Sequence, residues 1–492
     1  MTTGKAFNGK PYAGNPHVRF DEGEVASAAM PRRGSLLYNI NKMITFAAVA
    51  ASAAIPMAAN AATSITTTIN GVEWRFILDT PTGTKGSAML GINTSTSGTT
   101  GRANYELHGC PQDVSVNAAD IPWEFDYDGV HYTVTKVAQG AFFNTANMTG
   151  VLTIPPAVTE IRNCAFQNCT GLTGLRGGDS VTFWGTSAFN GCPQMHGAYP
   201  DLSAATYFGE EVFRVAPLTG TLKLGDSLAT ISLHAFQGCN FTGSAIIPSS
   251  VNSMGSNSDY GVFQDSPNLS AIWVKGKPDA ASQSYLTVYC AKLAASCQSM
   301  KMVLMGKNTK GGRMARTGSS AMLYGVTGVQ VFVPANGYWD GLVTGGTDNK
   351  VWYYGPTGEF DLEINHEWMQ ATITPTTVNA LTNALAWVPA FKTHSNLDAH
   401  ISVTNTIDLT DVTITEDMTS GVTFDRLVFS AKTQTQLDAI LGAFPATTPI
   451  SIDPTGLTEN MTIPDGYPNV FVKTVPGVTI RRTASGFIII VK

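Results

Sequence analysis

Acidic residues that alternate late in the chain could ligate a hard cation. Glu359, Asp361 and Glu363 would share one face of a strand, and carboxylate oxygens are the ligands that calcium prefers. A solvated strand face accounts for the same alternation, because charged side chains normally stay in water. We therefore predict no metal centre and keep these three residues as the candidates for one. His366 and Glu367 follow, but the second histidine of a zinc-protease motif is absent.

Other catalytic chemistry finds little support in the sequence. The segment Gly306–Gly318 is glycine-rich and basic, yet Lys307 is followed by Asn308 where a phosphate-binding loop needs serine or threonine. No G-x-S-x-G sequence occurs, and no cysteine lies in a nucleophile context. We predict a solvated loop at 306–318, no cofactor and no enzymatic activity.

The elements that would position any site are repeats. A small residue followed by phenylalanine recurs six times, at intervals of 24, 23, 24, 23 and 27 residues. A period of about 20 to 30 residues indicates a solenoid, in which each repeat is stabilised by stacking on its neighbours. The pairs are Ala141-Phe142, Ala165-Phe166, Ala188-Phe189, Val212-Phe213, Ala235-Phe236 and Val262-Phe263.

Each repeat has the pattern of two short strands joined by tight turns. Apolar and polar residues alternate before the phenylalanine, and asparagine, glycine and serine follow it. Stacked rungs lie about 4.8 Å apart, so equivalent side chains form ladders. We predict that the phenylalanines form one such ladder inside the core.

Two segments, 158–172 and 228–239, show the repeat most completely. They resemble the BspA-type leucine-rich repeats of bacterial surface proteins, and the resemblance covers residues 131–278. It implies a repeat solenoid of leucine-rich-repeat type, mostly β with tight turns. Members of that family are mostly secreted or surface-exposed, carry no catalytic residues, and those with a known role act in adhesion to host proteins or other cells.

Aromatic residues at variable positions are the candidate binding residues. Phe183 and Tyr207 occupy the same outward position in adjacent repeats, and Tyr199 is nearby in the sequence. Exposed stacked aromatic rings bind sugars or partner proteins. Packing between rungs under the N-terminal cap or a loop is the alternative interpretation.

The functional prediction is non-catalytic binding or adhesion at the bacterial cell surface, with a host or cell-surface protein or glycan as the partner. One alternative is an enzyme or accessory subunit of extracellular glycan degradation, with its chemistry in residues 350–492. Another is a structural component of a surface layer. The net charge of −6 argues against a nucleic-acid partner, and the sequence gives no indication of an oligomeric state.

An apolar run, residues 43–54, follows Arg32, Arg33 and Lys42 and precedes the small-x-small site Ala59-Asn-Ala61. This order is typical of a secretory signal peptide, and the run is too short to span a bilayer. We expect translation to start at Met30, with residues 1–29 a gene-model extension. The mature chain would then be secreted or at the cell surface, with no membrane span.

Seven cysteines are present, and an odd number leaves at least one unpaired within a chain. Cys169, Cys192 and Cys239 each follow a repeat phenylalanine by three residues, which favours small buried residues of the core. Disulfides between Cys169 and Cys192, or between Cys290 and Cys297, are the alternative. No spacing of a zinc site occurs.

Three further regions flank the repeats. Residues 62–130 contain two hairpin patterns, with turns at Asn70-Gly71 and Asp128-Gly129, and are predicted to be an N-terminal β cap. Residues 279–350 are predicted to hold a helix at 282–300, the basic loop and a closing strand at 329–335. Residues 351–492 are predicted to be a C-terminal α/β repeat pair, with helices at 377–385 and 433–441.

Overall fold

The computed structural model describes most of the chain after residue 62, and residues 61–492 form one unit. The predicted signal peptide and the segment before it, His366 and Glu367 lie outside the described residues. The described residues are 63–91, 109–110, 115–256, 260–278, 285–312, 314–355, 357–365, 369–395, 397–404, 407–409, 412–483 and 486–491.

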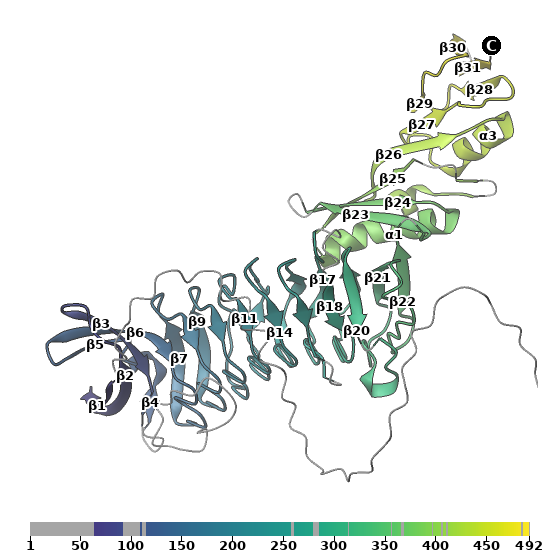
Figure 1. Ribbon diagram of the computed structural model, residues 1–492. Coiled ribbons are helices and arrows are strands. Elements are labelled where there is room, and N and C mark those ends of the chain that lie inside the picture. Colours follow the sequence, from purple (N-terminus) through teal and green to yellow (C-terminus); the bar gives the residue numbers. More distant parts are fainter. Residues whose placement is uncertain are drawn as a thin grey trace, which may run out of the picture. The chain divides into compact units, whose positions relative to one another are not determined.

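A β cap begins the described chain (Figure 1). Strands β1 (Thr63–Ile69) and β2 (Val72–Leu78) form an antiparallel hairpin. Its turn residues Asn70 and Gly71 have φ values of 54° and 81°, as a two-residue hairpin of this type requires. The second predicted hairpin joins β5 (Glu124–Tyr127) to β6 (Val130–Val137). Strand β3 (Lys85–Leu90) pairs with β2 and, in parallel, with β6, so the cap is continuous with the repeats.

The repeats stack through parallel pairs of short strands, which run side by side in Figure 1. We call the sheet that begins with β1 the first sheet. Its order is β1-β2-β3-β6-β8-β10-β11-β13-β16-β18-β20, with β5 beside β6. Its further strands are β8 (Glu160–Ile161), β10 (Phe183–Trp184), β11 (Tyr207–Phe208), β13 (Thr230–Ile231), β16 (Ser253–Met254), β18 (Leu286–Tyr289) and β20 (Thr309–Gly312).

The other strand of each repeat belongs to smaller sheets at first and then to one long sheet. A short 3-10 helix (Ala118–Asp120) follows β4, and a second (Gly318–Ser320) precedes the last rungs. The smaller sheets are β4 (Val116–Asn117), β7 (Met148–Ile154) and β9 (Leu172–Gly177), then β12 (Thr219–Gly220) and β14 (Asn240–Phe241). We call the long sheet that begins with β15 the second sheet; it starts with β15 (Gly243–Ile247), β17 (Leu269–Val274), β19 (Met302–Met305), β21 (Gln330–Pro334) and β22 (Lys350–Tyr354).

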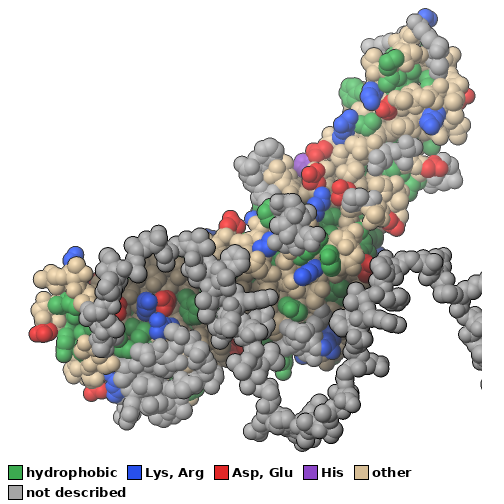
Figure 2. All heavy atoms as spheres, in the orientation of Figure 1, with side chains coloured by type: hydrophobic (Ala, Val, Ile, Leu, Met, Phe, Trp, Pro, Cys, Tyr) green, Lys and Arg blue, Asp and Glu red, His purple; other side chains and the backbone are tan. Residues whose placement is uncertain are grey.

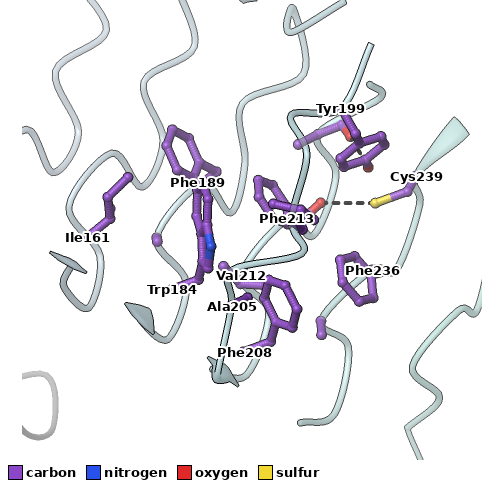
Figure 3. Close-up of a cluster of buried hydrophobic side chains, with 14 of the residues drawn as sticks. Ile161, Trp184, Phe189, Tyr199, Ala205, Phe208, Val212, Phe213, Phe236 and Cys239 are labelled. Atoms are coloured by element: carbon purple, nitrogen blue, oxygen red, sulfur yellow. Dashed lines mark hydrogen bonds between the residues drawn. The ribbon is translucent and has the colours of Figure 1, made fainter. Parts of the chain in front are cut away.

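The phenylalanines form the predicted ladder in the core. All six are fully buried. Successive rings lie 5.0, 5.1, 5.6, 6.1 and 5.7 Å apart between centroids, with planes within 14° of parallel. Figure 3 shows three of them, Phe189, Phe213 and Phe236, in successive turns of the chain. The one-rung spacing fixes this stacking, because each ring can meet its equivalent in the next repeat.

The repeats continue beyond the last phenylalanine. The backbone nitrogen of each phenylalanine in the ladder donates to the backbone oxygen of the residue just before the equivalent position of the next repeat. The same hydrogen bond joins Phe263 to Leu293 and Ala294 to Met322. Ala294 and Leu323 therefore occupy the next two ladder positions. The strand at 330–334 is not a closing strand, because β21 pairs with both β19 and β22.

The helix predicted at 282–300 is wrong for the part that the structure describes. Residues 285–300 form strand β18, paired with β16 and β20, followed by turns. Lys292 and Ser296 have φ values of 49° and 61°, which a continuous helix cannot contain. The short apolar run around Leu293 fills the core position of a rung, and this gave it a helical pattern.

Most strands of residues 351–492 continue the second sheet, and three form a separate sheet. The strand order continues to β29, and β23 and β24 pair antiparallel, so the strand direction reverses there. The remaining sheet of this region is ordered β28-β31-β30. The strands are β23 (Phe360–Asn365), β24 (Gln370–Pro375), β25 (Asp398–Val403), β26 (Thr423–Ser430), β27 (Ile450–Asp453), β28 (Met461–Pro464), β29 (Val470–Val472), β30 (Val478–Thr483) and β31 (Gly486–Val491).

Helices α1 (Val378–Ser395) and α3 (Gln434–Ala443) lie where the sequence predicts helices, and α2 (Glu416–Thr419) is a single turn. Helix α1 runs past Pro389 and packs against β15, β17 and β19 as well as β24 and β25. At its end, the hydroxyls of Ser244 and Ser270 donate to the backbone oxygen of His394 at 2.6 and 3.4 Å. The C-terminal region is therefore fixed to the repeats. Within the described part of the chain, no helix is long and apolar enough to cross a membrane.

Candidate functional site

One row of side chains runs along the outward side of the first sheet. The strand register aligns one residue from each rung, and alternate residues such as Ile161, Trp184 and Phe208 point into the core. We call this row the outward ladder; it consists of Lys136, Glu160, Phe183, Tyr207, Thr230, Ser253, Thr287 and Lys310.

Phe183 and Tyr207 are stacked on each other in this ladder. Their ring centroids are 5.1 Å apart and their planes differ by 9°. Both side chains are half-buried, so part of each ring is open to solvent. Two adjacent, partly exposed rings can contact the apolar face of a sugar or a side chain of a partner protein.

A charged group borders the aromatic pair at one end. Glu160 accepts from Lys136 Nζ at 2.8 Å and from Arg162 Nε at 3.2 Å. Burial tends to raise the pKa of Glu160, but the hydrogen bonds and charges of Lys136 and Arg162 outweigh it and lower the pKa below the usual 4.5. At the other end lie the hydroxyl groups of Thr230 and Ser253. The surface thus combines apolar rings with hydrogen-bonding groups.

The chain beside the outward ladder holds the rungs in a fixed register. The hydroxyls of Thr182 and Thr206 donate to the backbone oxygens of Thr159 and Thr182, at 3.2 and 3.0 Å. At Gly209 a Cβ atom would lie 2.3 Å from the backbone nitrogen of Thr186, so only glycine allows the rungs to approach this closely. The stacking of Phe183 on Tyr207 therefore belongs to a rigid surface.

Tyr199 is not part of this surface. Its side chain is 9% exposed and its ring stacks on Phe241 at 4.4 Å. Its hydroxyl donates to the backbone oxygen of Ala216 at 3.2 Å, and Figure 3 shows the ring beside Phe213 in the core. The prediction that Tyr199 contributes to binding is wrong, because the chain after Phe189 turns this residue inward.

The acidic candidates for a metal site do not gather around one point. The Glu359 carboxylate accepts from Asn379 Nδ2 at 3.1 Å, and Asp361 lies 3.9 Å from Lys307 Nζ. Glu363 is exposed. Among the residues that the structure describes, no group of three histidine, cysteine or acidic side chains could hold a metal ion.

The basic segment at 306–318 is not simply a solvated loop. Residues 309–312 form strand β20 of the first sheet. Gly306, Lys307 and Asn308 line a cavity together with Lys275 and Lys277. Sequence reasoning missed this cavity, because its residues come from segments far apart in the chain; the two closely spaced lysines after strand β17 were the available signal.

Among the residues drawn in colour in Figure 2, charged side chains of both signs are dispersed over this face. The identity of the repeats rests instead on their sequence. Residues 135–270 match the family described as BspA type Leucine rich repeat region, in six copies. The repeats of this stretch are thus similar to BspA-type leucine-rich repeats. The predicted family resemblance and the predicted solenoid fold are thereby confirmed for the BspA-type repeats.

Solved structures with some likeness include three bacterial proteins. A leucine rich cell surface protein from Faecalibacterium prausnitzii A2-165 is 16% identical, over 60% of this chain and 96% of that one, with a TM-score of 0.31. A leucine-rich repeat protein from Bacteroides ovatus ATCC 8483 is 14% identical over 85% and 90%, with a TM-score of 0.35. The pneumococcal vaccine antigen PcpA is 12% identical over 84% and 99%, with a TM-score of 0.27. No curated protein matches this chain.

Proposed function

We propose that this protein is a non-catalytic binding protein of the bacterial cell surface, which adheres to a host or cell-surface glycan or protein through the outward ladder. The stacked pair Phe183–Tyr207 carries the proposal, since two partly exposed rings stand together on a rigid sheet. The similarity to BspA-type repeats supports the proposal, because members of that family are mostly secreted or surface-exposed and those with a known role act in adhesion.

The energetic argument favours the aromatic pair as the centre of contact. Aromatic side chains lose little conformational freedom on binding, and they dominate the energy of most protein interfaces. Here the rings are already ordered by their contact with each other, so less conformational entropy is lost when a ligand binds to them. Glu160 and Thr230, on either side of the pair, can orient a polar ligand by hydrogen bonds.

A glycan and host-protein array probed with the full chain tests the proposal. The variant Phe183→Ala with Tyr207→Ala should lose at least about tenfold in affinity for the ligands that the wild type binds, as expected for residues at the centre of an interface. The matched control is Tyr324→Ala with Tyr338→Ala, which removes two exposed tyrosines outside the ladder. Binding that survives in the Phe183/Tyr207 variant, or that falls equally in the control, would remove the outward ladder as the site.

A further inference from the structure

A cavity of about 280 Å³ lies at the carboxyl ends of strands β17 and β19, beside β22 and β23. Lys275 and Lys277 follow β17, Lys307 follows β19, and Leu362 and Glu363 belong to β23. Parallel strands end at the same edge of a sheet, and such edges collect the residues of binding sites. The fold thus brings three lysines to the lining of one cavity.

The ammonium group of Lys277 is held in a defined position. Its Nζ donates to the backbone oxygen of Ser250 at 3.0 Å and to Oδ1 of Asn252 at 2.9 Å. Both acceptors are neutral, and the described part of the chain offers Lys277 no carboxylate within ion-pair distance. Burial lowers the pKa of Lys277. A third N–H bond of the group remains for a ligand, and its positive charge is uncompensated.

The other two lysines leave the positive charge in excess. Lys275 Nζ lies over the ring of Trp273, 5.9 Å from its centroid, a contact that keeps the charge in place without neutralising it. Lys307 is 3.9 Å from Asp361, which is a loose ion pair. The acidic group that lines the cavity is Glu363, which is exposed. Three lysines therefore outnumber two carboxylates, Glu363 in the lining and Asp361 beside Lys307.

The rest of the lining is apolar or a neutral hydrogen-bonding group. Leu362 and Tyr354 are each 1% exposed, and the Tyr354 hydroxyl donates a hydrogen bond to the backbone oxygen of Met305 at 2.7 Å. Asn308 adds an amide, although its Nδ2 already donates to the backbone oxygen of Lys277 at 2.9 Å. The volume is below the roughly 300 to 1,000 Å³ of drug-sized sites. The cavity suits one charged sugar ring rather than a larger group.

We propose that this cavity binds the oxyanion of an acidic polysaccharide, a sulfate or carboxylate group on one sugar ring. The lysine ammonium groups donate charge-assisted hydrogen bonds to the oxyanion, and the more exposed side chains of Pro278 and Ile364 contact the ring. The site uses none of the residues of the outward ladder. The two proposals can therefore fail separately: this cavity is tested on acidic polymers with lysine variants, and the outward ladder on the neutral glycans and proteins of the array with the Phe183/Tyr207 variant.

Binding of the full chain to four polymers distinguishes the sources of the oxyanion. Dextran sulfate carries sulfate groups, hyaluronan carries carboxylates, heparin carries both, and plain dextran carries neither. We expect binding to at least one charged polymer, competition by inorganic sulfate or acetate, and no binding to plain dextran. A preference for dextran sulfate identifies the bound oxyanion as a sulfate group, and a preference for hyaluronan identifies it as a carboxylate. Binding that is equal for plain dextran, or absent for all three charged polymers, overturns the proposal.

The variant Lys275→Gln with Lys277→Gln should weaken this binding by at least about tenfold, since two charge-assisted hydrogen bonds are lost. The matched control is Lys85→Gln with Lys432→Gln, which removes the same charge from two exposed lysines elsewhere. The control should stay within about twofold of the wild type, because screening weakens distant charges. If the double variant does not fold, Lys307→Gln and Lys275→Gln alone replace it. Unchanged binding in the folded variants, or an equal loss in the control, refutes the site.

Discussion

The thiol of Cys239 donates a hydrogen bond to the backbone oxygen of Phe213, 3.3 Å away and one repeat earlier (Figure 3). The same hydrogen bond recurs along the phenylalanine ladder. Its donor lies three positions after one ladder residue, and its acceptor is the backbone oxygen of the ladder residue one repeat earlier. The thiols or hydroxyls involved belong to Cys169, Cys192, Ser266 and Cys297, at 3.0, 3.2, 3.1 and 3.0 Å. The repeat cysteines therefore act as buried hydrogen-bond donors as well as small core residues.

This role predicts a difference between two substitutions of Cys239. Cys239→Ala removes the donor and leaves a small void, and should lower the free energy of unfolding by about 1 to 3 kcal/mol. Cys239→Ser keeps a donor at the position that Ser266 occupies in the next repeat, and should cost less. Urea unfolding followed by circular dichroism measures both. An equal loss in the two variants would mean that volume alone matters at this position.

The phenylalanine ladder should contribute more stability than the aromatic pair on the outward ladder. Phe213 is fully buried between Phe189 and Phe236, so Phe213→Ala should cost about 3 to 5 kcal/mol. Phe183 is half-buried, and Phe183→Ala should cost about 1 kcal/mol. The comparison uses thermal and urea unfolding of the two variants. A large loss in Phe183→Ala would assign that ring to structure rather than to binding.

Val215 is in a backbone conformation that suits it poorly. It has a φ of 56°, in the left-handed region, where a β-branched residue is strained. Asn144 and Asn168 occupy the equivalent place two residues after their phenylalanines, with φ values of 59° and 60°. Val215→Asn should therefore raise the free energy of unfolding by about 1 kcal/mol. Val215→Ala, which keeps a Cβ atom but removes the branch, should gain less. A Val215→Asn protein less stable than the wild type would contradict this explanation.

The repeat architecture could be predicted because one large residue recurs at a constant spacing. Ala294 and Leu323 replace phenylalanine at the next two ladder positions, so the sequence pattern does not reveal the rungs that follow Phe263. Phe183 and Tyr207 could be placed on one ladder from their equal offsets. Tyr199 could not be placed, because it lies between strands where no periodicity fixes its direction. The lysine cavity joins residues from 275 to 364, and such long-range proximity depends on the strand order, which the sequence does not show.

All seven cysteines are buried and free, so the alternative of disulfides between rungs is not formed. Burial raises the pKa of Cys192, Cys239, Cys290 and Cys297 to about 12, which keeps the thiols protonated and unreactive. We predict that the folded protein reacts slowly with a thiol reagent at neutral pH and rapidly once unfolded in urea. Its thermal midpoint should not change with a reducing agent. A midpoint that falls on reduction would reveal a disulfide.

Glu211 collects several donors at a turn of the repeats. It accepts from Ser187 Oγ at 3.1 Å, Asn190 Nδ2 at 2.9 Å and Arg214 Nη1 at 3.1 Å. Nδ1 of His234 lies 3.6 Å from Oε1, too far for a hydrogen bond but close enough for an ion pair when the ring is protonated. His234 is the largest influence on Glu211, and with Arg214 and Ser187 it outweighs burial and lowers the pKa of Glu211 below the usual 4.5.

Because this pKa is lower in the folded protein than in the unfolded chain, Glu211 stabilises the fold above about pH 4.5, and the stabilisation is lost as the pH falls through the lowered pKa. Glu211→Gln should therefore lower stability at neutral pH and show a shallower loss in acid than the wild type. Glu416→Gln, on the exposed turn α2, is the control and should keep the wild-type slope. Urea unfolding at a series of pH values from neutral to acid measures the slopes. A Glu211→Gln protein that loses stability in acid as steeply as the wild type would show that the donors around Glu211 do not favour its charged form.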